Sequence, residues 1–114
     1  MLSQALRDRI LQFREDRDWK QFHTLRTLST SIMLEAAELA EITQWISDGE
    51  LHETVTRERS RIEAEMADIA ILMTYLAADL GVDIAKAVEG KLLDNAARYP
   101  VDKCRGRSTK YDRL

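Results

Sequence analysis

The sequence predicts an all-α chain, and three observations indicate this fold class. Helix-forming residues dominate, and the 114 residues include only four glycines and one proline, the residues that interrupt helices most strongly. No segment alternates apolar and polar residues as a half-buried strand does. Apolar residues recur instead at the three- and four-residue spacing of amphipathic helices. We therefore expect a bundle-like arrangement of four helices, in a single domain that covers residues 1–114.

The first two helices are expected in the N-terminal half. Leu6 and Ile10 stand at helical spacing within the first, at about residues 3–15, as an amphipathic helix requires. A linking stretch, RDWKQFHTLRT, follows. The second helix is expected at about residues 28–46, with Gly49 just beyond it as a stop signal.

Two further helices are expected in the C-terminal half. The third runs from about residue 53 to residue 80 and ends at Gly81, a common helix terminator; because it is nearly 30 residues long, a loop in place of its first turns is the alternative. Asp83 is a plausible N-cap for the fourth, at about residues 84–97, because a carboxylate can accept from the first free backbone N–H groups. That helix ends before Pro100.

Residues 100–114 form a basic tail without apolar periodicity, which we expect to lie over the surface. The segment 101–114 has five basic and two acidic residues, about +3, whereas the whole chain carries −3. The remainder is therefore about −6. The overall negative charge does not suggest a nucleic-acid-polymer binder, but a basic tail on an acidic body could reach phosphate groups, with a solvated tail as the alternative. The one cysteine, Cys104, cannot form an intrachain disulfide or a zinc site made of thiolates.

We expect a cytoplasmic protein without a membrane anchor. The N-terminal stretch MLSQALRDRI carries charge in every turn, unlike a signal peptide. No apolar run in the sequence approaches the roughly 20 residues that span a bilayer. Because long helices in a short chain often share a core with another subunit, we also expect an oligomer.

The second helix carries a carboxylate where an apolar residue is expected. A helix turns about 100° per residue, so Leu39 and Ile42 lie within about 40° of Glu35 on the helical wheel. Glu35 thus occupies the middle of the apolar stripe. Glu38 lies about 60° to one side, with Trp45 seven residues further along the chain and nearly over it.

The third helix repeats this arrangement. Ile69 and Leu72 share the face of Glu65, Asp68 again lies about 60° to one side, and Tyr75 follows Asp68 after seven residues. An isolated Glu-x-x-Glu pair is common on helices and weak as a signal. Two pairs in the same phase are a stronger indication of a shared site.

Four acids directed at the interior of a bundle need compensation, because an ionised carboxylate costs several kcal/mol to desolvate. They either face a water-filled cleft or hold a cation, and oxygen ligands alone favour Mg²⁺, with Mn²⁺ as a substitute. A di-iron site would need Glu-x-x-His on its helices, and neither His23 nor His52 is so placed. Ordinary surface acids on a wrongly phased helix remain the alternative.

The acid pattern also resembles the signature of a known family. Glu-x-x-Glu, a spacer of residues 39–64 and Glu-x-x-Asp are similar to the motif of the MazG-like all-α nucleoside triphosphate pyrophosphohydrolases. The resemblance is closer to their dCTP pyrophosphatase branch and covers most of the chain. The matching segments are RDWKQFHT, EAAELAEITQW, EMADI, LGVD, KLLDNAARYPVDKCRG and KY.

The resemblance implies a function. It predicts Mg²⁺-dependent hydrolysis of (deoxy)nucleoside triphosphates to monophosphate and pyrophosphate, with dCTP-like substrates favoured, to clean the nucleotide pool. It also implies a helical bundle assembled as a homodimer or homotetramer. A non-catalytic helical interaction module with solvated acids is the competing class, and a hydrolase acting on another phosphoester would share the same site.

The resemblance also predicts the site residues. The metal ligands and catalytic acids would be Glu35, Glu38, Glu65 and Asp68, and Glu41 would orient or deprotonate water. The nucleotide-binding residues would be Trp19, His23, Trp45, Lys91, Asn95, Arg98 and Tyr99. Among these, Lys91 is suited to bind phosphate, and the amide of Asn95 is suited to bind a base or sugar.

One position departs from the dCTP pyrophosphatase branch. That branch tends to have a tyrosine in the base pocket one turn after the aspartate of the motif. Leu72 occupies this position here, and the nearest tyrosine is Tyr75. The sequence therefore leaves the base preference open.

Overall fold

The computed structural model describes residues 2–114, and within them every regular element is helical. The α-helices are α1 (Gln4–Asp16), α2 (Leu25–Gln44), α3 (Leu51–Arg57), α4 (Arg59–Leu80), α5 (Ile84–Arg98) and α6 (Val101–Cys104). Short 3₁₀ turns cover Lys20–Phe22, Asp48–Glu50 and Tyr111–Arg113. The all-α prediction is confirmed. The chain divides into two compact units, of which the first ends at Leu80 and the second is Gly81–Leu114.

The helix α2 begins three residues earlier than predicted and also ends earlier. Thr24 accepts a hydrogen bond from the backbone N–H of Thr27, whose hydroxyl accepts one from the backbone N–H of Thr24. This capping box satisfies two backbone donors and starts the helix at Leu25. At the other end Trp45 is the C-cap, so Gly49 lies beyond the helix in a 3₁₀ turn and does not terminate it.

The single long third helix was a wrong prediction, because the structure has two helices there. Helix α3 ends at Arg57, and Glu58 leaves the helical conformation with φ −95° and ψ 16° before α4 begins at Arg59. The sequence carries no proline or glycine at this point, which is why the break was not foreseen. The end of α4 agrees with the prediction, since Gly81 adopts a positive φ of 64°.

The second unit contains the predicted fourth helix and a partly helical tail. The Asp83 side chain accepts from the backbone N–H of Lys86, as expected of an N-cap. The tail forms α6 and a 3₁₀ turn rather than irregular chain alone. Tyr99 and Tyr111 pack edge to face at 6.0 Å, and Arg98 lies over the Tyr111 ring, so aromatic contacts fold the tail onto the end of α5.

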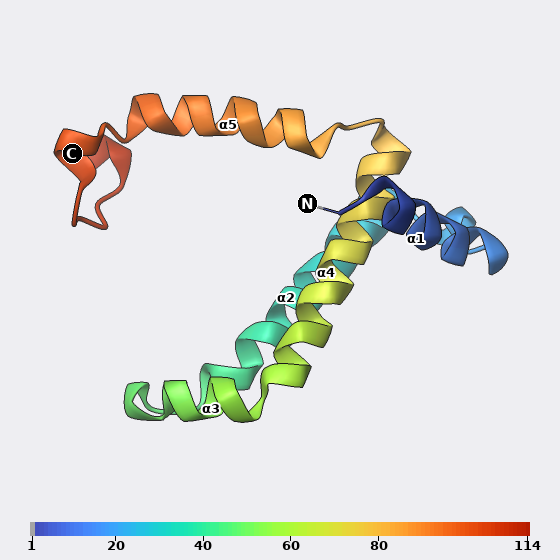
Figure 1. Cartoon of the computed structure of the whole chain (residues 1–114), viewed down its shortest axis with the longest axis horizontal. Coiled ribbons are helices and arrows are strands. Elements are labelled where there is room, and N and C mark those ends of the chain that lie inside the picture. The colour runs from blue at the N-terminus through green and yellow to red at the C-terminus, as the bar shows by residue number, and fades with distance from the viewer. Residues whose placement is uncertain (1) are drawn as a thin grey trace. The chain divides into compact units, whose positions relative to one another are not determined.

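The core of the first unit lies between α2 and α4, which run side by side, with α1 packed on α4 and α3 across their far ends (Figure 1). Its most buried apolar residues are Leu28, Ile42, Tyr75 and Ala77. In the described part of the chain, no helix is long and apolar enough to cross a membrane. The pairing of α2 with α4 brings the two predicted acid motifs onto adjoining helices.

Candidate functional site

Three of the four predicted metal ligands converge between α2 and α4. Glu35, Glu38 and Glu65 each offer a carboxylate oxygen, and these oxygens all lie within 4.8 Å of one another. Glu35 and Glu65 are half-buried, whereas Glu38 is exposed. Glu35 and Glu38 share α2 one turn apart, and Glu65 comes from α4, so the helix pair itself builds the cluster.

The other two predicted acids lie at or outside its edge. Asp68 is exposed and is not part of the three-oxygen cluster, but it lines the neighbouring pocket together with Glu35. Its charge is near enough to raise the pKa of Glu35. Glu41 is exposed and belongs to neither the cluster nor the pocket lining.

The cluster contains two buried oxygens that lack hydrogen-bond donors. Glu35 Oε2 and Glu65 Oε2 are both buried without a partner among the described residues. Two ionised carboxylates can only accept hydrogen bonds, so neither can satisfy the other. A proton shared with Glu65 is the main reason why the pKa of Glu35 rises to about 7, followed by burial and by the charges of Glu38, Asp68 and Glu65.

These residues fit a hard divalent cation. Orphaned buried oxygens are costly, and a cation would satisfy both. The cluster presents oxygen ligands only, the donor type that Mg²⁺ and Mn²⁺ prefer. Three carboxylate oxygens within 4.8 Å of one another also match the ligand spacing that a single ion with metal–oxygen distances near 2.1 Å requires.

An open pocket of about 790 Å³ adjoins the cluster in the first unit, within the size range of small-molecule sites. Four predicted site residues line it: Trp19, His23, Glu35 and Asp68. The remaining lining residues are Leu6, Arg9, Ile10, Gln12, Phe13, Asp16, Arg17, Ile71, Leu72 and Tyr75. The pocket thus combines an apolar, aromatic wall with an acidic edge.

The aromatic wall includes residues that the sequence analysis did not assign to the site. Phe13 packs edge to face against Trp19, with ring centroids 5.8 Å apart, and the Arg17 guanidinium lies 3.6 Å from the Phe13 ring centroid. Trp19 remains 45% exposed, so its ring is accessible to a ligand. Phe13 was visible in the sequence only as an apolar residue of the first helix, and nothing in its spacing distinguished a pocket wall from core.

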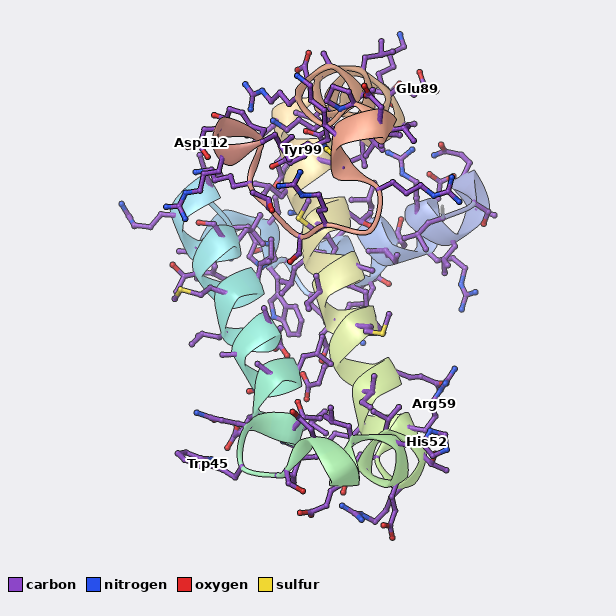
Figure 2. The ribbon with its side chains drawn as sticks, turned by 90° about the vertical axis from the view of Figure 1, so that its left-hand side faces the viewer. Trp45, His52, Arg59, Glu89, Tyr99 and Asp112 are labelled. Carbon is purple, nitrogen blue, oxygen red and sulfur yellow. The ribbon has the colours of Figure 1, made fainter. Side chains whose placement is uncertain are left out.

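Trp45 does not join this pocket in the first unit. It is the C-cap of α2 and is 83% exposed, and Figure 2 shows its side chain pointing away from the helices. Its predicted role in nucleotide binding stays a prediction.

The remaining predicted residues belong to the second unit, which is described by itself. Lys91 and Asn95 stand one turn apart on α5, as their spacing predicted, and Asn95 is half-buried. Arg98 ends α5, and the backbone N–H of Tyr99 donates to the carbonyl of Asn95. Their roles toward a nucleotide also stay predictions.

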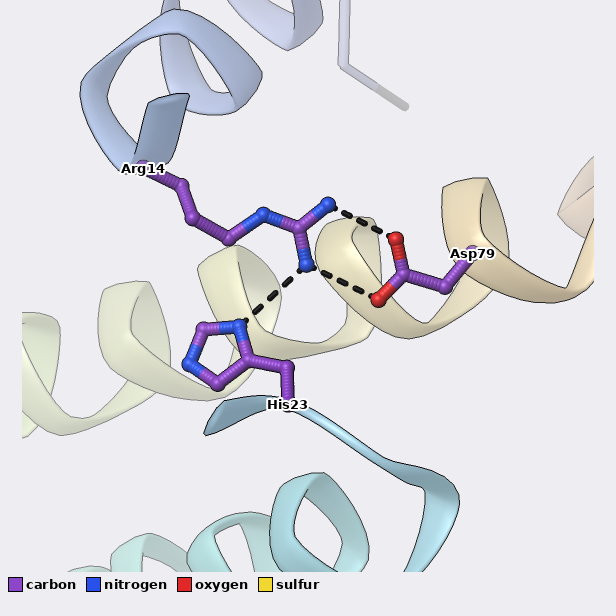
Figure 3. Close-up of polar contacts among 3 residues, drawn as sticks. All are labelled: Arg14, His23 and Asp79. Carbon is purple, nitrogen blue, oxygen red and sulfur yellow. Dashed lines mark hydrogen bonds and ion pairs between the residues drawn. The ribbon is translucent and has the colours of Figure 1, made fainter. Parts of the chain in front are cut away.

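A part-buried ion pair next to the pocket residue His23 was not anticipated. Arg14 donates two hydrogen bonds to Asp79, of 2.8 and 2.7 Å, and its Nη1 lies 3.2 Å from Nδ1 of His23 (Figure 3). Arg14 is only 4% exposed. The sequence did contain a signal for this contact. Arg14 follows Leu6 and Ile10 at the same four-residue spacing, so it is a charged residue at an apolar position of its helix, as Glu35 is in the second helix.

Known proteins resemble this chain over most of its length. The sequence pattern of the MazG-like family matches residues 30–114. The chain is 40% identical to dCTP pyrophosphatase 1 of Rattus norvegicus and of Homo sapiens over 105 residues, which are 90% of this chain and 62% of each relative. It thus spans less than two thirds of those relatives. A pyrophosphatase structure from Archaeoglobus fulgidus DSM 4304 superposes with a TM-score of 0.81 at 36% identity, covering 84% of this chain and 90% of that one.

Proposed function

Because this chain belongs to the MazG-like family, we propose that it hydrolyses (deoxy)nucleoside triphosphates to a nucleoside monophosphate and pyrophosphate. The observation that carries the proposal is the cluster of Glu35, Glu38 and Glu65 at the edge of an aromatic pocket, with two buried oxygens that have no hydrogen-bond partner within residues 2–114. A nucleoside triphosphate has a flat base at one end and a polyanion at the other. The pocket and the cluster match these two ends.

We propose that Mg²⁺, or Mn²⁺ in its place, is held by Glu35, Glu38 and Glu65, with Asp68 as the fourth ligand. Such an ion supplies charge neutralisation for the phosphates and lowers the pKa of a bound water. The carboxylates alone would repel a triphosphate, so their role is to bind and orient the ion. Glu41 is exposed on the same helix, and its predicted role in orienting water rests on the family resemblance alone.

The base would stack on Trp19, which combines a large ring with 45% exposure and an anchoring contact to Phe13. Stacking of this kind contributes about 1–3 kcal/mol per base. His23 lines the same pocket and offers a polar ring beside it. The relatives named dCTP pyrophosphatase 1 support a dCTP-like substrate. On the family resemblance we propose that Lys91 binds phosphate and that Asn95 binds the sugar or the base.

We propose that the protein acts as a homodimer or homotetramer. Large apolar side chains are exposed on the central helix pair, among them Leu34 and Met33 on α2 and Met66 on α4. A second copy would bury this surface. Multi-angle light scattering tests the assembly, and a monomer at micromolar concentration would contradict it.

The decisive experiment incubates the protein with canonical and modified nucleoside triphosphates and Mg²⁺ and separates the products. We expect monophosphate and pyrophosphate as products. Activity should be lost in Glu35→Gln and in Glu65→Gln, and retained in Glu63→Gln, which changes an exposed acid on the same helix as Glu65. Diphosphate and phosphate would refute the cleavage position. No turnover with Mg²⁺ or Mn²⁺ would favour the non-catalytic interaction module.

A further inference from the structure

The contact between Arg14 and His23 fixes which nitrogen of the imidazole carries the proton. Arg14 Nη1 lies 3.2 Å from His23 Nδ1. A guanidinium has donors and no acceptor, and it stays charged in proteins. Nδ1 must therefore accept the hydrogen bond, and the proton of the neutral ring is on Nε2. One of the two neutral tautomers is selected by this contact.

Arg14 is itself held in a fixed orientation. Its guanidinium forms two hydrogen bonds with the Asp79 carboxylate, and its Cζ lies 4.6 Å from the centroid of the Tyr75 ring. The rigid fork of a guanidinium makes such a two-bond contact directional. A path of contacts thus runs from Asp79 on α4, through Arg14 on α1, to His23 in the segment that joins α1 to α2.

The surroundings of His23 keep its ring uncharged. Burial lowers the pKa of His23 first, the nearby charge of Arg14 lowers it further, and Asp79 opposes them. The Tyr75 ring lies against the imidazole at a centroid distance of 5.4 Å and a tilt of 30°. A neutral ring, held between a tyrosine and an arginine, is restricted in both protonation and rotation.

The opposite nitrogen of the ring is available to a ligand. Arg14 is the one side chain within residues 2–114 that forms a hydrogen bond with the imidazole, and it uses Nδ1. His23 lines the same pocket as Trp19. A base stacked on Trp19 would therefore lie in the pocket that His23 lines, and within residues 2–114 the Nε2 of that ring has no hydrogen-bond partner.

We propose that Arg14 and Asp79 are positioning residues that hold His23 as an Nε2–H donor, and that this donor recognises an acceptor on the base. The second half rests on the proposed function. The acceptor would be a carbonyl oxygen or an unprotonated ring nitrogen. A base with an amino group or ring N–H at that point would be disfavoured, because two donors would face each other without an acceptor.

The tautomer is tested first, without nucleotide, by long-range ¹H–¹⁵N spectra of the full chain. The two histidines are His23 and His52, and exposed His52 provides the reference. We expect His23 to show a protonated Nε2 and an unprotonated, accepting Nδ1 at pH 7. In Arg14→Met/Asp79→Leu, which removes both charges so that neither is left buried alone, we expect a mixture of tautomers.

The matched control is Arg59→Met/Glu63→Leu. It removes an exposed ion pair, with 2.9 Å between Arg59 Nε and Glu63 Oε1, and neither residue lines the pocket (Arg59 is labelled in Figure 2). It should leave the His23 spectrum unchanged. Arg14→Lys is a second variant that keeps a buried charge and a donor, and we expect it to retain the tautomer. A protonated Nδ1 in the unmodified protein would overturn the proposal.

Kinetics then test the recognition of the base. We expect Arg14→Met/Asp79→Leu to raise KM for the preferred nucleotide about tenfold, with kcat within twofold and weaker discrimination among bases. Adding His23→Phe should cause no further rise, because the three residues act through one donor. Unchanged KM and discrimination would refute this role. Absence of turnover in the unmodified protein would refute the proposed function and, with it, recognition of the base. The tautomer of His23 is decided by the spectra alone, because they are recorded without nucleotide.

Discussion

Glu35 on α2 and Glu65 on α4 each keep one carboxylate oxygen buried and without a hydrogen-bond donor among residues 2–114. Both side chains are half-buried, and a third acid, Glu38, contributes an oxygen within 4.8 Å of theirs. Such an arrangement is unfavourable when all three are ionised. The three carboxylates between α2 and α4 therefore repel one another, and binding a proton or a cation reduces this repulsion.

We expect the metal-free protein to lose stability as pH rises from about 4.5 towards 7. The folded pKa of Glu35 is about 7 against an ordinary 4.5, so the folded state binds more protons in this window. The free energy of unfolding then falls with increasing pH. Urea denaturation in chelator at several pH values measures this trend.

The variant Glu35→Gln tests the cause of that trend. An amide can donate to Glu65, so we expect the metal-free variant to be more stable at pH 8, by up to about 1 kcal/mol, since solvent screens part of the repulsion. Glu63→Gln, which changes an exposed acid on α4, is the control and should keep the full pH trend. A flat profile in the unmodified protein would contradict the shared-proton interpretation.

Divalent cations should raise the melting temperature. At a hundredfold excess over Kd, ligand binding adds about 2.7 kcal/mol, which corresponds to roughly 10 °C for a chain of this size. We expect Mg²⁺ and Mn²⁺ to give such a shift, chelator to reverse it, and Glu38→Gln or Glu65→Gln to remove it. Thermal scans measure the effect, and an equal shift in Glu65→Gln would place the ion elsewhere.

The variant Asp79→Asn should destabilise the fold by about 3 kcal/mol, because it leaves the buried guanidinium of Arg14 without its counter-charge. The hydrogen bonds from Arg14 lower the pKa of Asp79 below its ordinary 3.8. The contribution of Asp79 is therefore complete above about pH 4 and is lost as pH falls through the folded pKa.

Acid unfolding of the two proteins, followed by circular dichroism, measures this contribution. Glu63→Gln breaks an exposed pair with Arg59 and should cost no more than about 0.5 kcal/mol. Equal losses in Asp79→Asn and Glu63→Gln would show that burial adds nothing to the Arg14 pair.

Trp19 should report nucleotide binding by its fluorescence. The chain has two tryptophans, so Trp45→Phe leaves Trp19 as the sole indole. We expect quenching by the preferred nucleoside triphosphate, because a base stacked on the ring contacts its face. The same titration with Trp19→Phe leaves Trp45 as the sole indole and tests the nucleotide-binding role predicted for it. Quenching of Trp45 alone would move the base site away from this pocket.

The sequence predicted the helices well where local chemistry decides them and poorly where tertiary packing does. Asp83 and Gly81 are caps with a direct backbone requirement, and both act as predicted. The break at Glu58 has no residue that forces it, so only the packing of the two flanking helices can account for it. The earlier start of α2 follows from a threonine pair that the periodicity of apolar residues does not report.

The candidate site was predictable as far as charged residues interrupt an apolar stripe. Glu35 and Glu65 were found by that signal, and buried Arg14 could have been found by it too. Which residues line a pocket depends on how α1 packs against α4, and spacing within one helix contains no such information. Phe13 therefore emerged as a pocket residue only from the structure.

The break at Glu58 has a consequence for how the chain tolerates insertions and deletions. One residue added within α4 between Glu65 and Thr74 would rotate that acid by about 100° relative to the buried residues that follow it and remove it from the cluster. The same addition between Arg57 and Arg59 falls in a non-helical junction, where it can be absorbed without turning α4. Length variation among homologous chains should therefore collect at this junction and be absent from the two acid-bearing helices.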